Sequence, residues 1–367
     1  MYYQVYSALM TASQAPFDFI IAGQGLAGTT LSYRLIREGY RVLVVDPGHV
    51  GSSSMVAAGL YNPITGRNMN KTWWADRLFR DLEDYYRDLE SLLGRRFLHD
   101  MPIYRPFMSV EEQNDWQSRA ADERFAPYIR QLHTRPRFTG KAQDPFGGLE
   151  LQPSGWLHIP YLLDAYREWL VEQDALFSES INMNDIYVAN GIVHAGDLRS
   201  KYLVDCTGVL SGTNRWFNWL PFRPVKGEII EVEADFDPNC ILNRGVFMVP
   251  LGGGRHRVGS TYHWQELSPD PRPEGIQEIE ERLGELVLFP WKRVDARAGI
   301  RPATKDRRPV LGAHPEEPRL LIFNGLGTKG VSLAPTMADL FCDWLGDKNP
   351  LPEEVNIKRF FSLYSRP

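Results

Sequence analysis

The sequence predicts an α/β fold with two parts: a domain built on a parallel sheet, and an α+β domain with an antiparallel sheet. Three observations support this. Residues 17–46 read as strand, glycine-rich turn, helix and second strand. Residues 224–262 are β-patterned in the manner of an antiparallel meander. At 367 residues the chain is too long for one compact core and suggests about two domains.

The composition is that of a globular protein, with 43% hydrophobic, 24% charged and 12% aromatic residues. A net charge of −5 with mixed signs argues against nucleic-acid binding, because such surfaces are usually basic. Cys206, Cys240 and Cys342 lie far apart without metal-ligand spacing, so we expect no metal and a reducing compartment. Residues 1–16 read as an N-terminal extension without signal-peptide character, and no apolar run approaches the ~18 residues of a spanning helix. We therefore predict a cytoplasmic protein.

The opening glycine motif gives the strongest signal. Residues 19–22 form an apolar run suited to a buried parallel strand, and Gly23, Gly25 and Gly28 follow it in a G-x-G-x-x-G pattern. In this Rossmann-like arrangement the first glycine permits a tight turn. The second lets the backbone approach a pyrophosphate, and the third lets the helix pack on the strand.

The elements after this turn complete the unit. A helix over 29–38 would offer N–H groups and a partial positive charge to the phosphates. Asp46 closes a second strand over 41–45 and would accept hydrogen bonds from an adenosine ribose. Together these features predict that the unit binds a dinucleotide. The alternative interpretation is a glycine-rich turn in an ordinary βαβ unit.

Small residues dominate the next segment and allow a backbone to approach a flat ligand: Ser52, Ser53, Ser54, Ala57, Ala58 and Gly59. Met55, Val56 and Leu60 are too apolar for a flexible surface loop, so we favour a ligand-lining segment. Residues 73–93 predict one long amphipathic helix. Its core side would carry Leu78, Leu82, Tyr85, Leu89 and Leu92.

The middle of the chain alternates between the two parts. Residues 97–148 lack buried parallel strands and predict the first piece of a second domain, with a strand over 103–108. A helix follows over 161–173. Asn190-Gly191 marks a hairpin between two short strands. The strand over 202–205 ends in Cys206-Thr207-Gly208, which could bring bare backbone against a cofactor or could simply end the strand.

The remaining segments supply a meander and a second glycine loop. Three strands over 224–262 would leave one sheet face free to form the wall of a substrate pocket, and a helix follows over 273–288. An apolar strand over 320–323 leads into Asn324–Val331, which opens a helix running to about Leu345. This second helix N-terminus can address another electron-rich group.

The set of motifs resembles the D-amino-acid-oxidase-like (DAO) family of FAD-dependent oxidoreductases, and within it glycine oxidase and sarcosine-oxidase-type enzymes. The resemblance covers nearly the whole chain from Asp18 to Leu345. The matching motifs are the Gly23–Gly28 pattern with Asp46, Ser52–Gly59, Asp205–Gly208, Pro224–Gly227, Gly299–Pro302, Thr304–Asp306 with Pro309, and Gly325–Gly330.

The resemblance implies a glutathione-reductase-like FAD-binding domain over 17–96, 149–222 and 294–367, and a substrate-binding domain over 97–148 and 223–293. FAD would be bound non-covalently, because no cysteine stands just ahead of the final glycine loop. The residues assigned to the cofactor are Gly23, Gln24, Gly25, Leu26, Ala27, Gly28, Asp46, Pro47, Ser52, Ser53, Ser54, Met55, Ala58, Gly59, Met183, Thr207, Gly208, Arg301, Gly325, Leu326, Gly327, Thr328, Lys329 and Gly330.

The resemblance also implies a chemistry, the oxidation of the C–N bond of an amine or amino acid. Arg301 falls on the family's carboxylate-binding arginine, and its alternative role is structural. Lys329 would stabilise negative charge on the reduced flavin, or could be an exposed loop lysine. Phe247 replaces a tyrosine of glycine oxidase, and Tyr262 or His263 could substitute for the lost phenol.

Other readings remain open. Thr328 replaces a second arginine of the glycine-oxidase loop, and together with Phe247 this puts simple glycine or sarcosine as substrate in doubt. The aromatic residues Tyr61, Trp73, Trp74, Phe247 and Tyr262 indicate a larger or more apolar substrate. A related FAD domain removes a group oxidatively from modified tRNA, and Leu60–Pro63 is faintly similar to it; the acidic charge and the lack of a methyltransferase domain count against this. A non-catalytic flavin-binding or electron-transfer protein is the third reading. The electron acceptor, O2 or another molecule, and the oligomeric state are not predicted.

Overall fold

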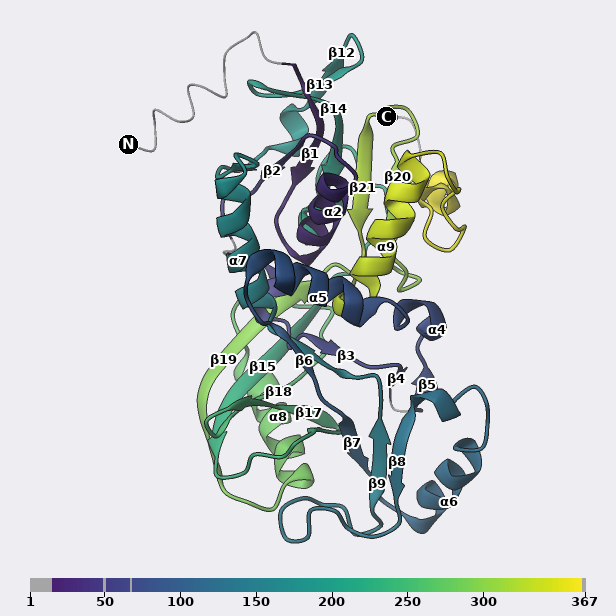
Figure 1. The fold of residues 1–367 in the computed structure, drawn as a ribbon. Helices are drawn as coiled ribbons and strands as arrows, with labels where there is room; N and C mark the ends of the chain where they lie inside the picture. The colour runs from purple at the N-terminus through teal and green to yellow at the C-terminus, as the bar shows by residue number, and fades with distance from the viewer. Residues whose placement is uncertain (1–14, 49–50, 67, 365–367) are drawn as a thin grey trace. The chain divides into compact units, whose positions relative to one another are not determined.

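The computed structural model describes residues 15–48, 51–66 and 68–364 (Figure 1). Contacts divide the chain into two compact units. The first unit comprises three segments of the chain: the one that ends at Ser52, Leu163–Pro224, and the one that begins at Arg301. The second unit comprises Ser53–Leu162 and Val225–Ile300.

This division differs from the predicted domain boundaries at residues 53–96, 149–162 and 294–300, which the sequence assigned to the FAD-binding domain and the contacts place in the second unit. Residues 223–224 differ in the opposite sense. The largest differences are the first two segments. The physical reason is a small sheet that joins them: β3 (Leu60–Tyr61), β10 (Gly155–Leu157) and β6 (Leu98–Asp100) pair with one another. The assignment of FAD and substrate to the two units stays a prediction.

A mixed sheet forms the centre of the first unit. Its strands within the described residues are β1 (Phe17–Ala22), β2 (Val42–Val45), β11 (Leu176–Phe177), β12 (Tyr187–Ala189), β13 (Ile192–Ala195), β14 (Leu198–Asp205), β20 (Val310–Ala313) and β21 (Leu320–Asn324). Strands β11, β2, β1, β14 and β21 pair in parallel, as predicted for the dinucleotide-binding part. Asn190 and Gly191 have positive φ values of 51° and 73°, which confirms the tight hairpin between β12 and β13.

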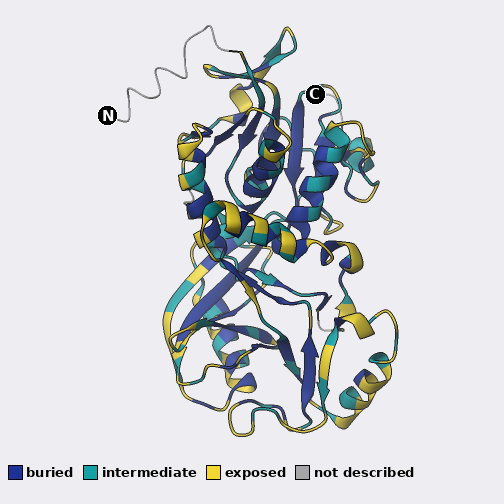
Figure 2. Cartoon of the chain, viewed as in Figure 1, coloured by how far each residue is buried: buried dark blue, intermediate teal, exposed yellow. Residues whose placement is uncertain are grey.

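Helices of this unit are α2 (Leu26–Arg37), α9 (Gly330–Leu345) and most of α7 (Ile159–Glu172), with short 3₁₀ helices η2 (Met183–Asp185), η3 (Gly208–Gly212) and η4 (Ile357–Leu363). Helices α2 and α9 contact each other. Dark-blue buried residues line the central strands in Figure 2. The core includes Ile20, Leu43, Leu203, Phe217 and Ile322. Because β1, β14 and β21 run parallel, their carboxyl ends meet at one edge of the sheet.

The second unit contains a large, mainly antiparallel sheet, as predicted. Its strands, in spatial order among the described residues, are β19 (Trp291–Arg301), β15 (Val225–Ala234), β18 (Arg255–Gly259), β17 (Val246–Gly252), β16 (Ile241–Arg244), β7 (Ile103–Pro106), β9 (Gly148–Leu151) and β8 (Ile129–His133). Helix α8 (Pro273–Leu286) covers one face. The core between helix and sheet includes Tyr104, Val232, Met248, Val258 and Leu283.

Smaller elements complete the second unit: α3 (Ser53–Val56), β4 (Ile64–Thr65), β5 (Asn70–Lys71), α4 (Ala75–Leu78), α5 (Leu82–Leu93), α6 (Val110–Arg119) and η1 (Ala126–Tyr128). The prediction of one helix over 73–93 is wrong, because the helix is interrupted between Leu78 and Leu82. Tyr86 takes the core position expected for Tyr85, and Leu92 is exposed. No helix in the described part of the chain has the length and apolar character needed to cross a membrane.

Candidate functional site

The first glycine loop is shaped by close backbone contacts. Gly23 has a φ of +98°, and a Cβ there would lie 2.9 Å from the carbonyl oxygen of Cys206. A Cβ on Gly28 would lie only 1.9 Å from the carbonyl oxygen of Gly23. These positions admit glycine alone, so the start of α2 packs directly on the end of β1. Gly25 is the N-cap of α2 and provides no side-chain cap, which suits a helix start that receives a phosphate.

Asp46 closes β2 and holds this loop in place. Its carboxylate accepts hydrogen bonds from Gln24 N and Gly48 N, both at 2.8 Å, and from Arg167 Nη1 at 3.1 Å. A carboxylate offers about four acceptor positions, so one is left for a ribose hydroxyl. Pro47 follows at the surface.

Arg167 is a residue that the sequence reasoning missed. It lies on α7, and its Nη1 also donates to Gln24 Oε1 at 3.0 Å. It thereby bridges the glycine loop and the end of β2. No local pattern identifies it, because Gln24 and Asp46 lie more than a hundred residues away from it in sequence.

The loop after β14 is fixed by a buried carboxylate. Asp205 accepts hydrogen bonds from Thr207 N at 2.9 Å, from Ser211 Oγ at 2.8 Å and from Asn214 Nδ2 at 2.8 Å. Asn324, at the end of β21, donates to the carbonyl oxygen of Gly208 at 2.8 Å. This network joins the carboxyl ends of two parallel strands and places Thr207 and Gly208 beside the first glycine loop.

The second glycine loop runs from Gly325 to Gly330. Gly325 and Gly327 have positive φ values of 79° and 56°, and Leu326 between them is buried. A Cβ on Gly330 would lie 3.1 Å from Leu26 Cδ2, so the start of α9 lies next to the start of α2. The structure thus brings together two helix N-termini, neither capped by a side chain.

Lys329 is the N-cap residue of α9 and is half-buried. Burial, and then the positive charge of Arg308, lower the pKa of Lys329 to about 8. Thr328 beside it is exposed. Arg301 lies in the same unit at the end of β19 and is partly exposed. An arginine buried in the core would favour a structural role, and Arg301 as a whole residue is only partly buried.

Met183, like Leu26 and Leu326, is a predicted cofactor residue with a buried apolar side chain. Its side chain is 5% exposed and belongs to the hydrophobic core of the first unit. Its carbonyl oxygen accepts a hydrogen bond from Trp216 Nε1 at 2.9 Å. The contact of Met183 with the cofactor stays a prediction.

The segment from Ser53 to Gly59 lies in the second unit. Ser53, Ser54 and Met55 form the short helix α3, and Ala58 follows it. A Cβ on Gly59 would lie 2.0 Å from the carbonyl oxygen of Leu157, so this glycine is required for packing against β10. The loop is therefore held against the small sheet.

Phe247 and Tyr262 also belong to the second unit. Phe247 pairs across the sheet with Gly259, and a Cβ on Gly259 would lie 3.0 Å from Phe247 Cζ. The phenyl ring thus occupies the space above this glycine. Tyr262 is 49% exposed on the loop that follows β18. The structure therefore groups the predicted site residues in two sets, one in each unit.

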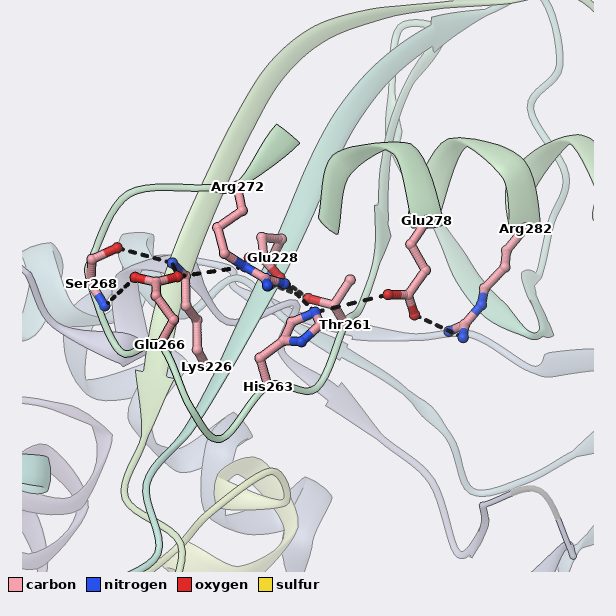
Figure 3. A network of polar contacts seen from close by, with 9 residues as sticks. All are labelled: Lys226, Glu228, Thr261, His263, Glu266, Ser268, Arg272, Glu278 and Arg282. Atoms are coloured by element: carbon pink, nitrogen blue, oxygen red, sulfur yellow. Dashed lines mark hydrogen bonds and ion pairs between the residues drawn. The ribbon is translucent and has the colours of Figure 1, made fainter. Parts of the chain in front are cut away.

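A buried ion-pair network anchors residues 261–272, hereafter the anchored loop (Figure 3). Lys226, fully buried on β15, donates to Glu266 Oε2 at 2.6 Å and to Ser268 Oγ at 3.0 Å. Glu228, also fully buried, accepts from Arg272 Nε at 2.9 Å and from the Thr261 hydroxyl.

His263 takes part in the same network. Its Nε2 lies 3.9 Å from Glu228 Oε2 and 3.8 Å from Glu278 Oε2, and Figure 3 shows the ring among these side chains. Lys226 belongs to the Pro224–Gly227 motif, so this motif has a structural role in holding the loop that carries Tyr262.

The residues of the first unit fit a dinucleotide. The two adjacent helix starts supply N–H groups and partial positive charge, Asp46 retains an acceptor position, and the glycines leave no side chain in the way. Within the described residues no group of three or more His, Cys, Asp and Glu side chains is arranged to hold a metal ion.

Comparisons with known proteins agree with this geometry. A family model described as FAD dependent oxidoreductase (DAO) matches residues 18–344. Glycine oxidase of Bacillus subtilis is 24% identical over 357 residues, which cover 90% of this chain and 94% of that protein. The tRNA 5-methylaminomethyl-2-thiouridine biosynthesis bifunctional protein MnmC of Idiomarina loihiensis is 23% identical over 376 residues. The match covers 94% of this chain, which spans only 59% of that relative's length.

Solved structures show the same fold. Glycine oxidase from Geobacillus kaustophilus superposes with a TM-score of 0.77 at 19% identity, covering 93% of this chain and 100% of that one. Iminodiacetate oxidase from Chelativorans sp. superposes with a TM-score of 0.76 at 20% identity, covering 93% and 98% of the two chains. The predicted combination of a parallel and an antiparallel sheet is confirmed.

Proposed function

Because the chain belongs to the DAO family of FAD-dependent oxidoreductases, we propose that it oxidises the C–N bond of an amine or amino acid. The observation that carries this proposal is the pair of adjacent, uncapped helix starts at Leu26 and Gly330, with Lys329 at the second. One start suits a pyrophosphate. The other suits a group that gains negative charge on reduction. Glycine oxidases among the relatives support an amine or amino-acid substrate.

When bound, FAD would supply the two-electron oxidant that converts the C–N bond of the amine to an imine. The resulting imine reacts with water to give a carbonyl product and an amine. The protein's part is to bind and orient. Arg301 would pair with a substrate carboxylate through its planar fork. Phe247 and Tyr262 are the other residues that we propose to contact the substrate.

The test is anaerobic bleaching of the flavin in the purified holoenzyme across a panel of amines and amino acids, followed by readmission of oxygen. Arg301→Met is expected to lower kcat/KM for carboxylate-bearing substrates roughly 100-fold, and to affect amines without a carboxylate far less. Arg319→Met, which alters another arginine of the first unit, serves as the control. Flavin that no amine bleaches would contradict the proposal and favour a binding or electron-transfer protein.

A second candidate is oxidative removal of a group from modified tRNA. It is favoured by the similarity to MnmC, although this chain spans 59% of that relative. Bleaching by tRNA that carries a modified uridine, but not by free amino acids, would support this candidate. Return of the oxidised flavin absorbance after oxygen is readmitted would indicate separately that O2 is the electron acceptor.

A further inference from the structure

A row of residues crosses the large sheet of the second unit at Phe247. Phe247 pairs with Gly259 on β18 and with Asn243 on β16. The register of β7 on β16 places Arg105 beside Asn243. Directly paired residues share a face, so this row lies on one face of the sheet. The alternate residues of the same strands point to the core beneath α8, so the row lies on the other face.

The residues of this row are partly exposed to solvent, whereas those of the next row on the same face are buried. Arg105, Asn243 and Phe247 are all partly exposed. The next row on the same face is fully buried and consists of Ile103, Ile241 and Val249. The Phe247 ring lies over Gly259, on the side away from Asn243. Only the short Asn243 side chain therefore separates the ring from Arg105 along the row.

Arg105 carries a charge that its surroundings leave poorly compensated. Its side chain is 12% exposed, and Nε lies 4.0 Å from Glu112 Oε1. Within the described residues, Arg105 Nε is buried without a hydrogen-bond partner. Glu112 instead accepts from Arg244 Nη1 at 2.7 and 2.8 Å and from Met108 N at 2.9 Å. Two guanidinium groups thus share one carboxylate.

Burial, and then the charge of Arg244, lower the pKa of Arg105 to about 10. A buried donor without a partner costs free energy, and an anion from outside would remove that cost. A carboxylate matches the planar guanidinium fork, and the amide of Asn243 can donate a further hydrogen bond.

We propose that Arg105 and Asn243 bind a carboxylate at the far end of the substrate, so that the enzyme prefers amines or amino acids with a second acidic group. This inference rests on the proposed function, in which Phe247 contacts the substrate. Arg105 lies two strands from Phe247, a span of about 10 Å that a short aliphatic arm can bridge.

The test compares substrates that differ only in the distal group: glutamate with glutamine, and iminodiacetate with its monoamide. We expect the holoenzyme to turn over each acid with a kcat/KM about tenfold or more above that of its amide. Arg105→Met should remove this preference by raising KM for the acids, with the amides unchanged. Arg105→Lys should retain part of it. Arg130→Met, in the same sheet on β8, is the matched control.

Equal turnover of acid and amide by the wild type would overturn the inference. So would an Arg105→Met effect that lowers both members of a pair alike, as a structural role predicts. If no amine bleaches the flavin, the proposed function itself fails, and calorimetry of the holoenzyme with glutarate and with inorganic phosphate then decides the site. Glutarate binding that Arg105→Met abolishes supports it; no binding, or binding of phosphate alone, overturns it.

Discussion

Single residues here owe their chemistry to neighbours that are remote in sequence. Lys329 is an ordinary lysine by sequence, and its lowered pKa arises from burial and from Arg308. Arg167 holds Asp46, and Arg105 carries a weakly compensated charge, yet neither has a local signature. The glycines of the first loop are the opposite case, because their spacing alone indicates a turn in which Gly23 and Gly28 have no room for a side chain.

The lowered pKa of Lys329 predicts that its positive charge lowers the free energy of unfolding, and that this effect depends on pH. Its folded pKa of about 8 lies below the ordinary 10.5, so the unfolded chain binds more protons between these values and stability rises with pH across that window. Lys329→Met should therefore stabilise the apoprotein at pH 7 by on the order of 1 kcal/mol. The gain should vanish near the upper end of the window, as measured by urea unfolding. The same gain at both pH values, or an equal gain from Lys358→Met, would refute this.

Among the elements, those with a strong periodic or glycine pattern could be predicted from the sequence. Strand β1, helix α2, the β12–β13 hairpin and helix α9 appear where expected. The break between α4 and α5 could not be predicted, because the apolar spacing continues through it and only tertiary packing decides where a helix ends. The small β3–β10–β6 sheet depends on contacts between distant segments, so local patterns did not reveal it.

Close packing between α2 and β1 predicts that substitutions at two glycines have very different effects on stability. Gly28→Ala would place a Cβ 1.9 Å from a carbonyl oxygen. It should destabilise the protein by about 2–4 kcal/mol and abolish flavin retention. Gly284→Ala, in helix α8, meets no atom within 4 Å. It should be neutral or stabilise by about 0.5–1 kcal/mol. Thermal unfolding and the flavin absorbance of the purified variants measure both; similar losses in the two would argue against the packing account.

The anchored loop should loosen locally when its buried carboxylate loses its charge. Glu228→Gln preserves size but removes the negative charge that Arg272 and Thr261 meet. We expect hydrogen exchange over residues 261–272 to accelerate about tenfold, with β17 unaffected. Glu281→Gln on the exposed side of α8 is the control. Acceleration spread evenly over the second unit would instead indicate a general loss of stability.

At the scale of the whole molecule, we expect flavin binding to stabilise the folded state of the first unit. The predicted cofactor contacts in the first unit come from three separate chain segments, which a bound dinucleotide would hold together. All three cysteines are buried. Burial raises the pKa of Cys240 and Cys342 to about 12 and raises that of Cys206 well above its ordinary value. Buried neutral thiols are poor nucleophiles, so we expect FAD to be bound without a covalent link.

Non-covalent binding predicts that acid precipitation leaves the flavin in the supernatant. It also predicts a melting temperature that rises with FAD concentration, since a ligand at 100 times its Kd stabilises the native state by about 2.7 kcal/mol. Absorbance of the two fractions and melting curves at several FAD concentrations measure these effects. Yellow colour that stays with the precipitate, or a melting temperature unmoved by FAD, would contradict them.

The pairing of β14 has a consequence for how the chain is made. Residues Leu203–Asp205 pair with β1 on one side and with Leu320–Ile322 of β21 on the other. During synthesis β14 leaves the ribosome long before β21 exists, so one edge of the central strand stays unpaired meanwhile. The second unit, in contrast, is complete once Ile300 has been added. A chain terminated after Ile300 and released from the ribosome should therefore contain a folded second unit and a first unit with an open strand edge, which favours aggregation.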